Sequence, residues 1–266
     1  MKQTDIVVVG GSAAGLTAAI TARRHYPDRS ILLVRKEEQV LIPCGIPYIF
    51  GTVGTPEKNL IPDAVLDKND IELLITEAKE LNTEEKSLRT DAGEIGYERL
   101  ILATGSKPAM PPIPGLDLNG VYPVFKDVDY LSELQGRLET AEDVVVIGGG
   151  FIGIEFGDEI NKIGGKNVTI VEMLPHCLML AYDEEFCVTM EAVLESRGVN
   201  VSAPARVARV AGNGHVERVE LADGTSIKAD TVVMGVGAVA NVDMAETAGL
   251  EIGPTGGINV DRTMKT

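Results

Sequence analysis

The sequence has few cysteines and histidines, and far fewer basic than acidic residues. Its three cysteines and three histidines stand at no spacing typical of a disulfide framework or a zinc site, so no metal centre is predicted. The 24 basic and 40 acidic residues give a net charge of −16, which would repel nucleic acid and anionic membranes. No apolar run reaches the roughly 18 to 20 residues of a membrane span. We therefore expect no nucleic-acid or membrane partner and, by default, a cytoplasmic location.

Two segments of this 266-residue chain repeat one order of elements, which is an apolar strand, a glycine-rich turn, a helix and a second apolar strand. Uninterrupted β-branched runs suit parallel strands that are buried on both faces. The sequence therefore predicts an α/β fold with two Rossmann-like dinucleotide-binding units. The expected strands are residues 5–9, 31–34, 143–147 and 168–171, and the expected helices are residues 16–22 and about 151–163.

A proline-rich stretch separates the two units. Residues 107–115 contain four prolines and are expected to break all regular structure. Residues 230–237 then repeat the apolar-strand-then-glycine ending seen at residues 100–105. We predict a first domain over residues 1–112, an inserted domain over 113–240, and a return to the first domain over 241–266.

The first glycine turn follows the strand at residues 5–9 and is a G-x-S-x-x-G variant. Gly10 permits a tight turn, and Gly15 lets the helix pack closely on the strand. Ser12 replaces a glycine, yet its small side chain still lets a pyrophosphate approach the N–H groups at the helix start, near Ala13 and Ala14. The turn is predicted to bind a dinucleotide; the alternative is a purely structural turn.

The first unit lacks the acidic residue that usually follows its second strand. Arg35 and Lys36 stand where a carboxylate would bind a ribose, and both are expected to contact the cofactor. Several alternatives stay open. Either Glu37 or Glu38 reaches the ribose, or a water or backbone group replaces the acid, or the site holds a different nucleotide.

The second glycine turn has the full G-x-G-x-x-G pattern. It comprises Gly148, Gly150 and Gly153, with Phe151 and Ile152 inside it. Glu172 ends the next strand, 24 positions after Gly148. A carboxylate there can accept hydrogen bonds from ribose hydroxyls and repel a 2′-phosphate, which favours NADH over NADPH. The alternative is a surface glutamate without a ligand.

Cys44 lies in the segment Leu41-Ile-Pro-Cys-Gly-Ile-Pro-Tyr48, just after a predicted strand. Glycine and proline keep this segment irregular, and a thiolate there could attack a disulfide or become a sulfenate. The alternative is an inert cysteine in a tight turn. Cys177 and Cys187 are expected to be buried small hydrophobes, and three methionines are expected to fill the core near the second turn: Met173, Met179 and Met190.

These motifs resemble the flavin-dependent pyridine nucleotide-disulfide oxidoreductases. The resemblance spans the whole chain and is carried by Gly10–Gly15, Cys44–Tyr48, Ala103-Thr104-Gly105, Gly148–Glu155 and Val260–Thr263. Because Ile49 stands where a second cysteine would be, it points to the single-cysteine branch, which includes coenzyme A-disulfide reductases, NADH oxidases and peroxidases, and persulfide reductases.

The resemblance implies an enzyme that binds FAD at the first turn and NAD(H) at the second. Hydride would pass from NADH to the flavin and then to an oxidised Cys44, with a disulfide, persulfide, peroxide or oxygen as the final small-molecule acceptor. Phe151 would form the gate between nicotinamide and flavin, and Glu155 would lie beside the nicotinamide. The strand ends at Ala103, Thr104, Gly105 and Gly235 are further expected cofactor contacts.

The resemblance also implies that Thr266 precedes the family's Gly-Asp flavin contact and its dimerisation domain. A homodimer is expected only where that domain is present. Two other functions stay open. One is a flavoprotein reductase of a small electron-carrier protein that uses no thiol chemistry. The other is a nucleotide-binding module without catalysis.

Overall fold

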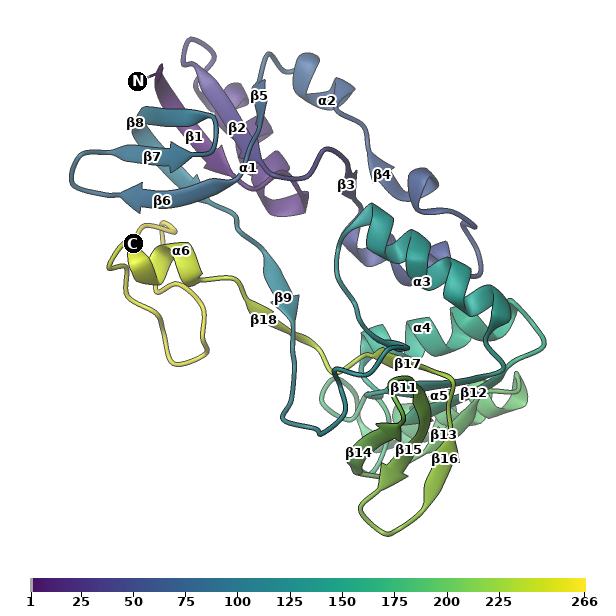
Figure 1. Ribbon diagram of the computed structural model, residues 1–266. Coiled ribbons are helices and arrows are strands. Elements are labelled where there is room, and N and C mark those ends of the chain that lie inside the picture. The colour runs from purple at the N-terminus through teal and green to yellow at the C-terminus, as the bar shows by residue number, and fades with distance from the viewer. Residues whose placement is uncertain (1) are drawn as a thin grey trace. The chain divides into compact units, whose positions relative to one another are not determined.

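The computed structural model describes residues 2–266 (Figure 1). The chain forms two compact units, and each is described by itself. The first unit contains residues up to 43, residues 60–107 and residues 239–266, and the second contains residues 44–59 and 108–238.

A six-stranded mixed sheet forms the centre of the first unit, with the order β5-β2-β1-β8-β7-β6. Strands β5, β2, β1 and β8 are parallel, whereas β8, β7 and β6 pair antiparallel. The strands are β1 (Lys2–Val9), β2 (Ile31–Arg35), β5 (Glu72–Ile75), β6 (Ala78–Asn82), β7 (Ser87–Thr90) and β8 (Gly93–Leu102), and β3 (Val40–Leu41) pairs with β4 (Leu60–Ile61).

Helix α1 (Ala13–His25) follows the first glycine turn and packs against one face of this sheet (Figure 1). Its buried residues Gly15, Ala19 and Ala22 are small, so the helix can approach the strands closely. Alternate residues of β1 and β2 belong to different core clusters on the two faces. Burial on both faces explains why these strands read as continuous apolar runs. The unit also contains α2 (Ala64–Asp67) and α6 (Asp243–Thr247).

The second unit contains a wholly parallel sheet with the order β10-β17-β11-β12-β13. A separate antiparallel sheet, β14-β15-β16, supplies Val210, Val219 and Leu221 to the same core as Val145 and Val232. The strands are β10 (Val121–Pro123), β11 (Asp143–Ile147), β12 (Asn167–Val171), β13 (Asn200–Ser202), β14 (Val207–Gly212), β15 (Val216–Leu221), β16 (Ser226–Lys228) and β17 (Thr231–Met234). The helices are α3 (Val128–Thr140), α4 (Phe151–Lys162) and α5 (Glu184–Ser196).

Residues 44–59, called the cysteine segment from here on, belong to the second unit. The predicted first domain, in contrast, ran unbroken from residue 1 to 112. This segment forms three short 3₁₀ turns, Pro43–Gly45, Pro47–Ile49 and Pro56–Asn59. Ile49 is fully buried, and the ring of Phe50 lies 5.3 Å from that of Phe156 on α4, measured between centroids. Apolar burial against α4 therefore groups the cysteine segment with the second glycine turn.

Two smaller expectations were wrong. The proline-rich stretch is not wholly irregular, because β9 (Ser106–Pro108) forms a two-stranded sheet with β18 (Ala238–Ala240). Met173, Met179 and Met190 do not fill the core, since their exposed fractions are 69%, 36% and 36%. Met173 and Met179 lie in the loop before α5, and Met190 lies on α5. An apolar side chain is not buried by its composition alone, since much of a protein's surface is apolar.

Candidate nucleotide sites and cysteine segment

The first glycine turn joins β1 to α1 with little room for side chains. Gly10 has φ +112°, and a Cβ at this position would lie 2.1 Å from the Ala103 carbonyl oxygen. A Cβ at Gly15 would lie 1.9 Å from the Gly10 carbonyl oxygen. Both predicted roles, a tight turn and close helix packing, thus have a direct steric cause.

Ser12 caps α1 by position, but its hydroxyl makes no capping bond. Its Oγ is buried and has no hydrogen-bond partner within residues 2–266. Ala13 and Ala14 are exposed in the first helical turn, which contains no acidic residue to occupy the N–H groups. A hydroxyl without a partner among the described residues, beside the N–H groups that a helix start leaves without partners inside the helix, fits the pyrophosphate of a dinucleotide such as FAD.

A cavity of about 310 Å³ adjoins this turn at the carboxyl ends of the parallel strands. Thr104 lies in its lining after β8, where its hydroxyl donates to the Asn241 carbonyl oxygen at 2.6 Å. Gly105 follows with φ +71° and accepts a hydrogen bond from the Asn241 N–H. Ligands of open α/β sheets bind at this edge. The lining residues are Val9, Gly10, Val34, Arg35, Lys36, Glu37, Thr76, Glu77, Ala78, Lys79, Thr104, Asn241, Asp243, Met244 and Thr247.

Arg35 occupies the place of the expected acid, and its guanidinium group is buried and bonded to other residues of the protein. Its side chain is 2% exposed and forms a bidentate pair with Asp63, with N···O distances of 2.7 and 2.8 Å. Nε and Nη2 also donate to the carbonyl oxygens of Glu37 and Glu38. The positive charge is therefore neutralised, and the arginine holds the loop after β2 in place.

In that loop, Glu37 and Glu38, the two alternative ribose-binding residues, lie in different surroundings. Glu37 lines the cavity together with Lys36, whereas Glu38 is exposed and outside it. Of the two, Glu37 is therefore better placed to accept hydrogen bonds from a ribose. Asp63 could not be recognised from sequence, because it lies 28 residues from Arg35 with no local pattern linking them.

The second glycine turn, between β11 and α4, repeats the geometry of the first. Gly148 has φ +106°, and a Cβ at Gly153 would lie 1.8 Å from its carbonyl oxygen. Gly235 at the end of β17 takes the place that Ala103 has in the first unit, with its N–H bonded to the Ile147 carbonyl. A Cβ at Gly150 would meet nothing within 4 Å, which leaves the start of α4 open to a ligand. Two predicted contacts lie at this helix start: Ile152 is half-buried, and Phe151 is 54% exposed.

Glu172 is buried, and its carboxylate braces this turn. One oxygen accepts from the Gly149 N–H at 2.6 Å and the other from the Leu174 N–H at 2.7 Å. A carboxylate has about four acceptor positions, so capacity for ribose hydroxyls remains. The neighbouring Cys177 is fully buried, as expected, and burial raises the pKa of its thiol to about 12.

The cysteine segment lies against α4. Cys44 is exposed, whereas Cys177 and Cys187 are buried. The side chain of Glu155 on α4 interacts with that of Tyr48, four residues beyond the cysteine. Burial raises the pKa of Glu155 above its usual range, and the nearby Glu159 carboxylate raises it further, against the lowering effect of Tyr48. Cys44, Tyr48 and Glu155 thus belong to one unit, in which Tyr48 and Glu155 interact.

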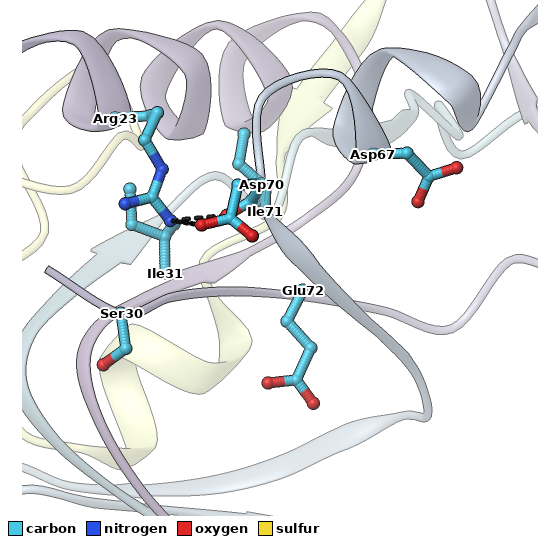
Figure 2. Close-up of a pocket in the computed structure, with 7 residues that line it drawn as sticks. All are labelled: Arg23, Ser30, Ile31, Asp67, Asp70, Ile71 and Glu72. Carbon is cyan, nitrogen blue, oxygen red and sulfur yellow. Dashed lines mark hydrogen bonds and ion pairs between the residues drawn. The ribbon is translucent and has the colours of Figure 1, made fainter. Parts of the chain in front are cut away.

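A second cavity of the first unit, of about 350 Å³, lies at the amino-terminal ends of β2 and β5 (Figure 2). Figure 2 shows Arg23 and Asp70 directed toward each other, and their ion pair measures 3.3 Å. Arg23 also donates to the carbonyl oxygens of Pro27, Arg29 and Asn69. This arginine ties loops together at the end of the sheet opposite the glycine turn, so we assign the cavity no ligand.

A family model described as pyridine nucleotide-disulphide oxidoreductase matches residues 4–266. The chain belongs to this family. The predicted family, the α/β fold and the Rossmann-like character of the units are therefore confirmed. Proteins of this family use FAD and NAD(P)H, which agrees with the predicted cofactors. In residues 2–266, no helix has the length and apolar character needed to cross a membrane.

Among its relatives, the chain is 33% identical to an NAD(P)H coenzyme A polysulfide/persulfide reductase of Pyrococcus horikoshii, over 98% of this chain and 60% of that protein. It is 31% identical to a rubredoxin-NAD(+) reductase of Pseudomonas putida, over 98% of this chain and 68% of that protein. The solved structure of an NAD-dependent persulfide reductase from A. fulgidus matches with a TM-score of 0.89 and 34% identity, covering 97% of this chain and 50% of that chain. The chain thus spans about 60% of the length of the first of these relatives.

Proposed function

We propose that this chain is the nucleotide-binding part of an NADH-dependent flavoprotein oxidoreductase that reduces its acceptor through Cys44. The observation that carries the proposal is the exposed thiol of Cys44, which lies three residues before the 3₁₀ turn Pro47–Ile49 that packs against α4, the helix that begins at the second glycine turn. The buried cysteines offer no comparable thiol. The similarity to two persulfide reductases favours a persulfide or a mixed disulfide with a thiol such as coenzyme A as the group reduced.

Each glycine turn has a distinct task in this proposal. Ser12, the start of α1 and Glu37 would hold FAD, and Gly150, the start of α4 and Glu172 would hold NADH. Bound flavin would supply the two-electron carrier between NADH and the sulfur. Two electrons and solvent protons then cleave the S–S bond between Cys44 and its partner thiol, which gives the Cys44 thiol and a free thiol.

Glu155 and Phe151 have supporting tasks. Burial raises the pKa of Glu155, so its carboxyl group beside Tyr48 takes up a proton more readily than an exposed glutamate does. Phe151 opens α4 with an exposed ring, which stacks edge-on against Tyr182 with 5.9 Å between centroids. An aromatic ring there can shield a nicotinamide from water.

An anaerobic NADH titration followed by visible absorbance tests the proposal. Wild-type protein should bleach a bound flavin and consume one further equivalent of NADH, which Cys44→Ser should not consume. Cys187→Ala, which removes a buried thiol, is the matched control and should behave like wild type. Equal NADH consumption by wild type and Cys44→Ser would refute the role of Cys44.

The similarity to a rubredoxin reductase supports a second candidate, a reductase of a small electron-carrier protein that needs no thiol. Under that function, Cys44→Ser would reduce carrier and dye as fast as wild type. A colourless protein that binds NADH but no flavin would instead identify a nucleotide-binding module.

A further inference from the structure

The residue on which this inference rests is Glu159, a buried carboxylate in the middle of α4. It is 1% exposed, and a buried carboxylate is costly unless its oxygens have donors. The Thr52 hydroxyl lies 3.0 Å from Oε1 and 2.8 Å from Oε2. Lys162, one turn further along α4, places its ammonium 2.6 Å from Oε1. The charge is thus paired on its own helix, and the remaining donor comes from the cysteine segment.

The backbone of the cysteine segment meets the helix at the same point. A Cβ at Gly51 would lie 2.4 Å from the Glu159 carbonyl oxygen and 2.7 Å from Oε2. Only a glycine lets the chain lie this close to α4. Thr52 is in turn tied to Tyr48, because the N–H groups of Thr52 and Val53 both donate to the Tyr48 carbonyl oxygen, at 3.0 and 2.7 Å.

Three contacts between the segment and α4 therefore follow in order. Tyr48 interacts with Glu155, Phe50 packs on Phe156, and the Thr52 hydroxyl bonds to Glu159. A further hydrogen bond of 2.6 Å joins Gln135 of α3 to the Gly54 carbonyl oxygen. The apolar contact supplies burial, whereas the hydrogen bond between Thr52 and the Glu159 carboxylate fixes the position of the segment along the helix axis.

We propose that Glu159 is a positioning residue for Cys44: through Thr52 it fixes the cysteine segment along α4, so that the thiol keeps a constant position relative to the second glycine turn. The importance of this for catalysis rests on the proposed function of Cys44. The contact between Thr52 and Glu159, called the clamp below, does not depend on a bound cofactor.

Thr52→Val tests the clamp, because it keeps the shape of the side chain and removes its hydroxyl. Amide exchange at Val53 and Gly54 should quicken about tenfold, the effect of losing one hydrogen bond to a charged acceptor. The rate of Cys44 alkylation by iodoacetamide should change at least about threefold, since the thiol then samples other positions. Thr52→Ser keeps the hydroxyl, so its exchange and alkylation rates and its urea midpoint should all stay near those of wild type.

Thr189→Val is the matched control, because Thr189 also loses a 2.7 Å hydroxyl hydrogen bond, to the Glu185 carbonyl on α5. It should leave both Cys44 readouts unchanged. Glu159→Gln keeps an acceptor for Thr52 and should change the two rates less than Thr52→Val does.

Wild-type exchange and alkylation rates in Thr52→Val, or equal effects of Thr189→Val, would overturn the proposal. A failure of the proposed function looks different. In that case Cys44→Ser would leave the NADH titration unchanged, while Thr52→Val would still alter amide exchange in the cofactor-free chain.

Discussion

At the scale of single residues, Gly10 should be among the least replaceable positions in the first unit. Gly10→Ala combines a positive φ with a 2.1 Å approach to a backbone oxygen, whereas Gly93→Ala has a similar φ of +121° and nothing within 4 Å. The φ strain alone costs about 1–2 kcal/mol, so Gly10→Ala should lower the free energy of unfolding by clearly more than Gly93→Ala. Urea denaturation measures both, and equal losses would show that the close approach to Ala103 has no cost.

The thiols should differ in reactivity by position. Cys44 should be alkylated in the native protein at neutral pH, whereas Cys177, with its pKa raised to about 12, should stay unmodified until the protein unfolds. Because the folded state keeps this proton while the unfolded thiol ionises near its ordinary value of 9.0, stability should fall as pH rises from about 9 to 12. Mass spectrometry after iodoacetamide treatment tests the first point, and native labelling of Cys177 would contradict it.

At the scale of elements, the ion pair between Arg35 at the end of β2 and Asp63 at the start of α2 should stabilise the first unit. Asp63→Asn leaves the nearly buried guanidinium without a counter-charge and should cost about 2 kcal/mol, less than for a fully buried pair because Asp63 is 46% exposed. It should also weaken FAD retention, since the loop containing Glu37 loses its anchor.

Glu80→Gln provides the control for that prediction. The Arg89–Glu80 pair belongs to the same unit, but both side chains are about 60% exposed, so its loss should cost under about 1 kcal/mol. Urea denaturation and absorbance after gel filtration measure stability and flavin retention. Equal effects of the two substitutions would mean that Arg35 tolerates the loss of its partner.

At the scale of the whole molecule, ligands should act on the two units separately. NADH should slow amide exchange in β11, β12 and the turn at residues 148–153, and it should leave the first turn at residues 10–15 unchanged. Glu172→Ala removes the carboxylate that braces Gly149 and should abolish this protection. Hydrogen exchange read by mass spectrometry distinguishes the units, and protection of the first turn by NADH would contradict the assignment.

The sequence by itself determined the two strand, turn and helix units, because each is specified by neighbouring residues: an apolar run, glycines at fixed spacing and a helix-forming stretch. The strands at residues 31–34 and 168–171 were predicted to within one residue at each end. Glycine roles at Gly10 and Gly148 were equally local, because a positive φ is required within the turn itself.

Only the tertiary structure decided which distant residues complete each site. Asp63 neutralises Arg35 from 28 residues away, and Thr52 meets Glu159 from 107 residues away. The grouping of residues 44–59 with the second unit and the exposure of Met173 were likewise not predictable. Local periodicity shows which face of an element is apolar, but the partner of a buried charge depends on which segments fold against it.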